Sequence, residues 1–360
     1  LQVLCAVIFL VAYTVYAASS IKACGTLFNT VMNMDATAAM YLAAFIIISY
    51  TFLGGFSAVC WTDFFQGMIM LAALLLAPIF ALALVGQGEG AVGGQLPEGF
   101  FHLFTTPQDV ISGLGWGLGY FGMPHIIIRF MSIKSEKELR KSSVIGISWT
   151  VIILVMSALT AVAGRLYLGE IEDSSTVFIT MVRRIFPALV SGLLLSAILS
   201  AAMSTADSQL LAASSAFASD VYKPLIRKNA SDKEMLWASR LVVMAISVVA
   251  LLIASNPNSG SIMGLVENAW GVFGAAFGPV ILLSLFWKKL TFGGTVAGIA
   301  VGAGVDVLWL ILAKSSTGIY EIVPGFFAGL LAAWLVSALD KKGPGAQVEA
   351  LFDEASKPGL

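Results

Sequence analysis

The sequence is short of charge. Asp, Glu, Lys and Arg make up 11% of its 360 residues, whereas a soluble globular domain carries roughly 25%. So few charges cannot cover the surface of a soluble protein of this size, but a lipid bilayer does not demand them. Hydrophobic residues make up 58% of the chain, and the mean hydropathy is +0.91. The composition therefore predicts an integral membrane protein.

The sequence also lacks the patterns of several other protein classes. Its three cysteines, Cys5, Cys24 and Cys60, form no CxxC pair and have no histidine nearby, so neither a disulfide framework nor a zinc site is expected. A net charge of −1 without a basic stripe argues against nucleic acid as a partner. There is no GxxxxGK[ST] phosphate loop. Neither an enzymatic activity nor a cofactor is predicted, because no nucleophile–base pair or metal cluster falls at membrane depth.

The sequence opens on Leu1, inside an apolar run. No basic region and no small-residue cleavage site precede this run, so it is not a signal peptide. We expect that the sequence begins partway through a longer protein.

Ten segments reach the length of about 20 mostly apolar residues that a membrane-crossing helix needs. They are residues 1–24, 36–58, 64–86, 110–131, 144–168, 187–206, 235–254, 262–287, 295–313 and 322–339. We therefore predict an all-α polytopic fold with about ten transmembrane helices in residues 1–340, followed by a tail at 341–360. The stretch 176–186 is predicted to form a short amphipathic helix on the membrane surface.

Lysine and arginine lie on alternate connecting segments. Fifteen of the 20 basic residues lie between 129 and 141, between 223 and 240, at 288–289 and after 339. The opposite set of segments keeps only Lys22, Arg165, Arg183, Arg184 and Lys314. Because basic loops face the cytoplasm, we expect a multi-pass protein of the cell membrane with a cytoplasmic C-terminal tail.

The fourth span contains the run ISGLGWGLGYFGMPHIII, with five glycines ahead of Pro124. Glycine costs about 1 kcal/mol and proline about 3 kcal/mol at a helix position, so this run predicts an interrupted helix. Interrupted helices form midplane solute sites in secondary transporters. Trp116 and Tyr120 are four residues apart and are predicted to wall an apolar solute. The alternative is that the glycines serve only close helix packing.

The sixth span ends in SAILSAAMSTADSQLL. Ser204 and Thr205 place two hydroxyl groups together, and the Ala201 carbonyl is one turn back. Sodium is a hard cation that prefers several oxygen ligands, and these groups supply them without a buried charge. The alternative is that the hydroxyl groups bond only the carbonyls of their own helix. We expect this stretch, like the fourth span, to be broken at the middle of the bilayer.

Ionisable residues at membrane depth are functional candidates by default. They are Asp63, Asp207, Glu267 (which precedes Asn268 and Trp270) and Asp306. Asp63 is expected to act on an ion path or, with Thr62, to cap the helix that follows. Asp306 is expected to pair structurally or to face water.

At these motifs the sequence resembles the sodium/solute symporter family, and within it the sodium/proline symporters. The strings that carry the likeness are YTFLGGFSAVCWTD, GWGLGYFGMPHIIIRFM, SAILSAAMSTADSQLL, DVYK and NAWGVFGAAFGPV, spread in order over nearly the whole chain. The resemblance implies a leucine-transporter-like inverted repeat of five plus five core helices, here lacking its first core helices. Residues 1–88 would be the remainder of the first repeat, 109–287 the second repeat, 291–340 peripheral helices and 341–360 a cytoplasmic tail.

The resemblance also implies sodium-coupled uptake of a small organic solute, most simply L-proline, with sodium, solute and membrane lipid as partners. It assigns the Ala201 carbonyl and the Ser204 and Thr205 hydroxyls to sodium. Its assignments to the solute site are Trp116, Tyr120, Pro124 and Tyr16, and those to the ion path or its gates are Asp63, Asp207 and Trp270. The solute carboxylate is expected to meet backbone N–H groups at the helix break, where a half-helix N-terminus is positive.

Other solutes stay open at this point. Met123 stands where some members of the family carry glutamine, and Asn268 where some carry an aromatic residue. The alternatives are a symporter for another amino acid, a carboxylate or a vitamin, and a transporter-like membrane domain that acts as a sensor. A passive channel is a further, weaker alternative.

Overall fold

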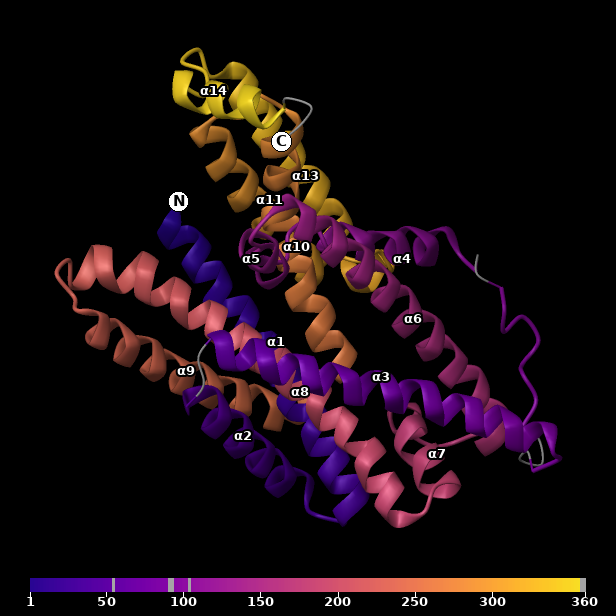
Figure 1. Cartoon of the computed structure of the whole chain (residues 1–360). Coiled ribbons are helices and arrows are strands. Elements are labelled where there is room, and N and C mark those ends of the chain that lie inside the picture. The colour runs from indigo at the N-terminus through magenta and orange to yellow at the C-terminus, as the bar shows by residue number, and fades with distance from the viewer. Residues whose placement is uncertain (54–55, 90–93, 103–104, 357–360) are drawn as a thin grey trace.

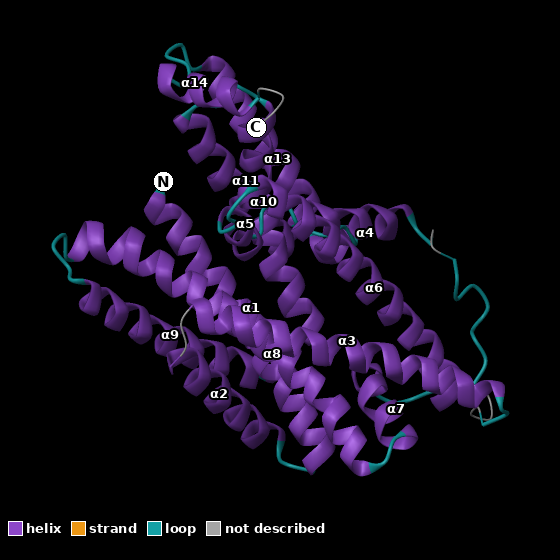
Figure 2. Ribbon diagram, viewed as in Figure 1, coloured by secondary structure: helices purple, strands orange, loops and turns teal. Residues whose placement is uncertain are grey.

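A computed structural model describes residues 1–53, 56–89, 94–102 and 105–356, and every regular element within these residues is a helix (Figures 1 and 2). The first half contains α1 Gln2–Met32, α2 Ala36–Leu53, α3 Phe56–Gly86, α4 Pro107–Gly119, α5 Pro124–Met131, α6 Glu136–Leu168, η1 Ser174–Thr176 and α7 Val177–Ile185. The second half contains α8 Ala188–Ala216, η2 Phe217–Ile226, α9 Asp232–Ser255, η3 Pro257–Ser259, α10 Ile262–Phe286, α11 Phe292–Leu312, α12 Lys314–Thr317, α13 Ile322–Leu339 and α14 Ala346–Ala355.

Eight of the described helices are long and apolar enough to cross a membrane. They are α1, α3, α6, α8 together with η2, α9, α10, α11 and α13. Of the other two predicted spans, the second is the short apolar helix α2 and the fourth is the pair α4 and α5. The prediction of an all-α polytopic protein is confirmed. Lys357, which was counted for the orientation, lies outside the described residues.

Five predicted boundaries differ from the structure by five residues or more. The first span was expected to end at 24 and the fifth to begin at 144, but α1 continues to Met32 and α6 begins at Glu136. The second span was expected to reach residue 58 and the third to begin at 64, but α2 ends at Leu53 and α3 begins at Phe56. Residues 54–55 of this motif lie outside the described residues. The sixth span was expected to end at 206, yet α8 continues to Ala216 and passes into the π-helix η2. Its polar run does not end the helix, because much of that run packs inside the bundle, where Asp207 and Gln209 are buried.

Helix α1 is the centre of the larger helix group. It packs against α2, α8, α9 and α10, and its buried face consists mainly of small residues such as Ala12, Ala17 and Ala18. Small side chains let membrane helices approach closely. The larger side chain of Tyr13 is also fully buried on this face, so it is held by neighbours from several helices.

Helices α10, α11 and α13 form a second tightly packed group, at the upper end of the molecule in Figure 1. Their contact uses glycines: a Cβ atom at Gly302 would meet the Ala275 carbonyl of α10, and one at Gly329 would lie 3.0 Å from the Gly298 carbonyl of α11. Helix α4 packs on α10 and α13 of this group. The first half of the interrupted span is therefore positioned by the second helix group.

Helices α3, α6 and α7 form the third group, which α8 joins. The predicted amphipathic helix is present as α7: Ile179, Met181 and Val182 are buried, whereas Arg183 and Arg184 are more exposed. Arg183 donates to the Thr30 carbonyl at the end of α1, at 3.0 Å. That α7 is helical is thus confirmed; its position at the membrane surface stays a prediction.

Candidate functional site

The interrupted helix predicted from the glycine-rich run is confirmed. Helix α4 ends at Gly119 and α5 begins at Pro124, so residues 120–123 separate two half-helices. Met123 is extended, with φ −77° and ψ 110°. Proline has no amide hydrogen and disfavours a helical conformation in the residue before it, so Pro124 and Met123 set the start of α5.

The break lies against α10. A Cβ atom at Gly119 would meet the indole ring of Trp270, and one at Gly122 would meet the Phe273 carbonyl and lie 2.8 Å from the Gly278 amide nitrogen. Nothing lies within 4 Å of a Cβ atom at Gly113 or Gly117. The two explanations of the glycine run therefore both apply: the glycines next to the break allow close packing, and the break itself is present.

We predict that Gly122→Ala destabilises the protein by about 1–3 kcal/mol, because the added methyl group would overlap backbone atoms that cannot rotate away. Gly117→Ala is the matched control on the same half-helix and should be neutral or slightly stabilising, since open space surrounds it. Thermal unfolding of the purified protein in detergent measures both. Equal unfolding midpoints for the two variants would contradict the packing of the break.

The first turn of α5 is capped by the protein itself. The His125 amide donates to the Tyr13 hydroxyl at 3.1 Å, and the Ile126 and Ile127 amides donate to the Met123 carbonyl at 3.1 and 3.2 Å. Pro124 has no amide hydrogen to offer. Each of these three amides therefore already has an acceptor within the protein, and the expectation that backbone N–H groups at the break meet a solute carboxylate stays a prediction.

A row of aromatic rings runs along α4 and the break. Trp116 packs on Trp270 of α10, with ring centroids 5.9 Å apart, and on Tyr320, at 5.4 Å. Tyr120 meets the same Trp270 edge to face at 5.0 Å. The Trp270 Nε1 atom also donates to the Trp116 carbonyl at 3.0 Å. This carbonyl lies in the last turn of α4. The structure thus joins Trp116, Tyr120 and Trp270 in one cluster.

A cavity of about 470 Å³ lies beside the break and collects most of the remaining candidate residues. Its lining includes Tyr16 of α1, Asp63 of α3, and Ser204 and Thr205 of α8. Because η2 follows α8 without a break and the two together extend to Ile226, the hydroxyl pair lies in the middle of a continuous helical run, not at its end. The expectation of a second broken stretch here is wrong, since α8 is helical throughout Ala188–Ala216.

The two hydroxyl groups of α8 differ. The Ser204 hydroxyl donates to the Ala201 carbonyl at 3.1 Å, the local bond that the alternative interpretation expects. Within the described part of the chain, the Thr205 hydroxyl makes no hydrogen bond, and it faces the cavity. Ala201 itself lines a neighbouring cavity, to which α1, α3, α6, α7 and α8 all contribute. The two hydroxyl groups therefore lie on the wall of the first cavity, and the Ala201 carbonyl is in hydrogen-bond contact with one of them.

Asp63 does not cap a helix. Helix α3 begins at Phe56, so Asp63 is inside it and the capping interpretation is wrong. Its carboxylate forms an ion pair with Arg129 of α5, at 2.7 Å, and both groups contact Ser208 of α8: Arg129 donates to the Ser208 hydroxyl at 2.9 Å. Asp63 is 19% exposed and Arg129 is 46% exposed. This contact joins α3, α5 and α8 at one side of the cavity.

A second cavity of about 460 Å³ continues from the first. The two share Cys60, His125, Arg129 and Ser208, and the second extends along α8 and η2 to Asp220. The ion pair of Asp63 and Arg129 therefore lies where the two cavities meet. The basic residues predict that this direction leads to the cytoplasm.

The other ionisable candidates lie outside these cavities. Asp207 is fully buried in α8 and is not part of either lining. Asp306 does not face water as one alternative proposed: it is fully buried in α11, and a Cβ atom at Gly271 would lie 2.9 Å from its carboxylate. Glu267 forms an ion pair with Lys314 at 3.2 Å.

Sequence reasoning missed four residues that the structure brings to the site: Tyr13, His125, Arg129 and Tyr320. Arg129 was counted only as a cytoplasmic charge, although an arginine in the last turn of an otherwise apolar half-helix indicates a charged partner nearby. Tyr13 and Tyr320 carried no local signal, because their partners are 112 and 208 residues away in the sequence. Pro124 is buried at the start of α5, as the break requires.

Comparison with known proteins adds to this geometry. The sequence model of the sodium:solute symporter family matches residues 1–302. The chain is 41% identical over 362 residues to the high-affinity proline transporter PutP of Bacillus subtilis (strain 168). This match covers 98% of this chain and 76% of that protein. The chain is 42% identical over 374 residues to sodium/proline symporter 2 of Staphylococcus saprophyticus, covering 99% of this chain and 73% of the relative.

A solved structure shares the fold. The chain matches a Na+-coupled sialic acid symporter in a substrate-bound outward-open state, with a TM-score of 0.75 over 95% of this chain and 75% of that chain. The sequence identity is 19%, so this likeness concerns the fold alone. It confirms the leucine-transporter-like helical fold that the resemblance predicts.

Proposed function

Because the chain belongs to the sodium:solute symporter family, we propose that it couples the inward movement of sodium to the uptake of a small organic solute, L-proline. It is a multi-pass membrane transport protein and not an enzyme. The observation that carries the proposal is the cavity beside the helix break, where Tyr16, Asp63, Ser204 and Thr205 meet. Two relatives named as proline transporters or symporters support proline as the solute.

Sodium would bind at the α8 end of this cavity. The hydroxyl oxygens of Ser204 and Thr205 and the carbonyl of Ala201 are neutral oxygen ligands of the kind that a hard monovalent cation prefers. Ser204 and Ala201 are already within hydrogen-bond distance of each other, so a small rotation of the hydroxyl would free the carbonyl for the ion. Asp63 would attract the cation from the other side of the cavity and Asp207, buried in α8, would add negative charge.

Proline would lie between this cavity and the aromatic row. Tyr16 lines the cavity on the side of α1. The faces of Trp116 and Tyr120 would receive the apolar pyrrolidine ring, with Pro124 fixing the break beside them. Trp270 contacts both rings and would set their orientation.

The positive-inside rule supports an orientation with the tail 341–360 in the cytoplasm, for a protein that would lie in the cell membrane. We assign residues 1–88 and 109–287 to the two inverted repeats of the fold and residues 291–340 to the helices outside them. Rocking of one repeat against the other would then expose the cavity to each side of the membrane in turn.

The sodium gradient supplies enough energy for this task. One positive charge moved through about 100 mV yields roughly 2.3 kcal/mol, and a tenfold sodium gradient adds about 1.4 kcal/mol. Together these terms support accumulation of the solute by a few hundredfold, because each 1.4 kcal/mol corresponds to a factor of about ten.

Uptake of labelled proline by liposomes that contain the complete protein tests the proposal. We expect accumulation with an inward sodium gradient and only slow equilibration with an equal potassium gradient. Unlabelled amino acids, carboxylates and vitamins are added as competitors, and only proline and its close analogues should reduce the signal. Equal uptake with both gradients would reject sodium coupling, whereas strong competition by an unrelated solute would reject proline.

A further inference from the structure

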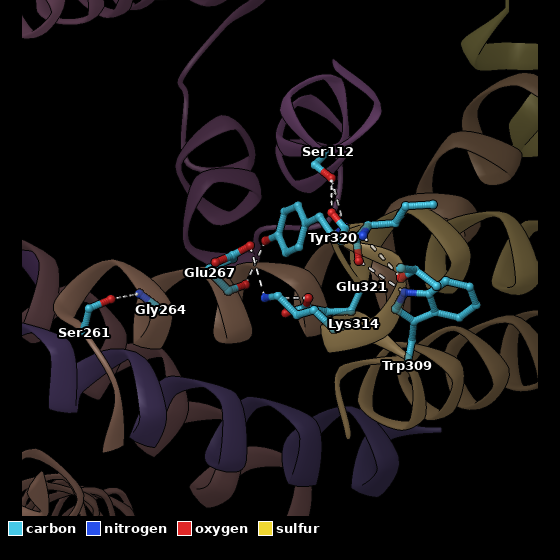
Figure 3. Close-up of polar contacts among 11 residues, drawn as sticks. Ser112, Ser261, Gly264, Glu267, Trp309, Lys314, Tyr320 and Glu321 are labelled. Atoms are coloured by element: carbon cyan, nitrogen blue, oxygen red, sulfur yellow. Dashed lines mark hydrogen bonds and ion pairs between the residues drawn. The ribbon is translucent and has the colours of Figure 1, made fainter. Parts of the chain in front are cut away.

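Tyr320 is buried at the corner where α12 leads into α13, and it contacts both α4 and α10. It is 2% exposed. Its ring packs on Trp116 of α4, with centroids 5.4 Å apart. Its hydroxyl group donates to the Glu267 carbonyl of α10 at 2.8 Å. Figure 3 shows the ring between Ser112 of α4 and Glu267 of α10.

The backbone of the same corner is bonded to α4. The Tyr320 amide donates to the Ser112 hydroxyl at 3.0 Å, and that hydroxyl donates to the Gly318 carbonyl at 3.3 Å. Gly318 has a φ of +67°, a left-handed conformation that glycine adopts without strain. The turn therefore bends the chain so that both ends of this short loop contact one serine of α4 (Figure 3).

Lys314 and Trp309 also bond to this corner. Lys314 forms ion pairs with Glu321, at 2.8 Å, and with Glu267 of α10, at 3.2 Å, and its ammonium group lies 5.5 Å from the centre of the Tyr320 ring. Partial burial disfavours the charged form of Lys314, but the bonds to the two glutamates outweigh this effect and raise its pKa. Trp309 of α11 donates to the Ile319 carbonyl at 3.2 Å.

We propose that Tyr320 is a positioning residue for solute binding: it holds the Trp116 ring in place, and so makes the α12–α13 corner part of the solute site. This inference rests on the proposed function and extends it to a region that the resemblance assigned to peripheral helices.

The packing of α4 explains why Tyr320 has this effect. Helix α4 is only 13 residues long, ends at the break and packs on α10 and α13. The Trp116 ring has Trp270 on one side and Tyr320 on another, and a Cβ atom at Gly115 would meet Val323 and Ile322 of α13. Without the Tyr320 ring, the Trp116 side chain would gain rotational freedom. Solute binding would then have to restrict this freedom, which weakens affinity.

The test compares three variants of the complete protein in liposomes. Tyr320→Leu removes the ring and should raise the proline concentration for half-maximal uptake about tenfold, with the maximal rate per molecule within a factor of about three of the unchanged protein. Tyr320→Phe keeps the ring and loses only the hydroxyl, so this variant should retain most of the affinity for proline. Phe326→Leu is the matched control: Phe326 is a buried aromatic of α13, the helix that follows the corner, is 3% exposed, and its ring lies over Gly278 of α10.

A purely structural role for Tyr320 gives a different result. Tyr320→Leu and Phe326→Leu would then both lower the amount of folded protein or the maximal rate of proline uptake. The half-saturating proline concentration would stay unchanged in both, and this result would overturn the inference. Direct binding of labelled proline to purified protein at saturating sodium gives a second measure that does not depend on turnover. If the unchanged protein itself shows no sodium-dependent proline uptake, the proposed function fails, independently of Tyr320.

Discussion

Thr205→Ala is expected to raise the sodium concentration for half-maximal proline uptake about tenfold or more, with little change in the amount of folded protein. Thr205 faces the cavity, and its hydroxyl has no hydrogen-bond partner within the described residues that would be lost by the substitution. Its removal would take away one oxygen ligand of the ion. A polar contact to a charged group contributes about 1.5–3 kcal/mol, and each 1.4 kcal/mol is a factor of about ten in affinity.

The matched variants separate an ion ligand from a packing group. Thr205→Ser keeps the hydroxyl group and should keep most of the sodium affinity. Ser196→Ala removes a hydroxyl from the same helix that bonds only the Leu193 carbonyl of its own turn, and should have no effect on sodium dependence. Uptake is measured against sodium concentration at saturating proline. An unchanged sodium dependence of Thr205→Ala would remove Thr205 from the ion site.

Loss of either partner of the Asp63–Arg129 pair is expected to reduce sodium-driven uptake about tenfold or more. Removing one partner of a buried pair costs about 3–5 kcal/mol because the other charge is left without compensation. Since Arg129 is 46% exposed, solvent screens part of the uncompensated charge. We therefore expect a cost at the lower end of this free-energy range or below it. The pair lies where the two cavities meet, so a lone charge there would act on the cation that passes.

A double-mutant cycle tests this expectation. Asp63→Asn and Arg129→Gln should each impair uptake, and the double variant should recover part of the activity because no unpaired charge remains. Arg227→Gln is the control: Arg227 pairs with Glu234 at 3.0 Å on an exposed surface, and its loss should leave uptake unchanged. Additive effects of Asp63→Asn and Arg129→Gln would show that the two groups act independently and would contradict a joint role.

Much of the site could be predicted from residue types alone. The glycine run followed by Pro124 required a break, because a helix interior tolerates neither well, and α4 and α5 confirm it. The hydroxyl pair at 204–205 and Asp63 were identifiable because polar groups are rare in such apolar segments. The structure brings these residues with Tyr16 to one cavity.

Helix ends were harder to predict. The sequence around residues 204–207 is polar and was interpreted as the end of a span, yet α8 continues to Ala216. Asp63 was interpreted as the start of a helix that begins instead at Phe56. In both places polar side chains are accommodated by neighbouring helices or by a cavity, which a linear count of apolar residues does not detect.

The sequence by itself determined the class of protein, the broken helix and the family, because each follows from local composition or from strings of adjacent residues. Only the tertiary structure decided which distant groups meet: Arg129 with Asp63, the Tyr13 hydroxyl with the α5 amide, and Tyr320 with Trp116. The physical reason is that hydropathy places a helix in the bilayer, whereas its neighbours and rotation depend on close packing between helices far apart in the chain.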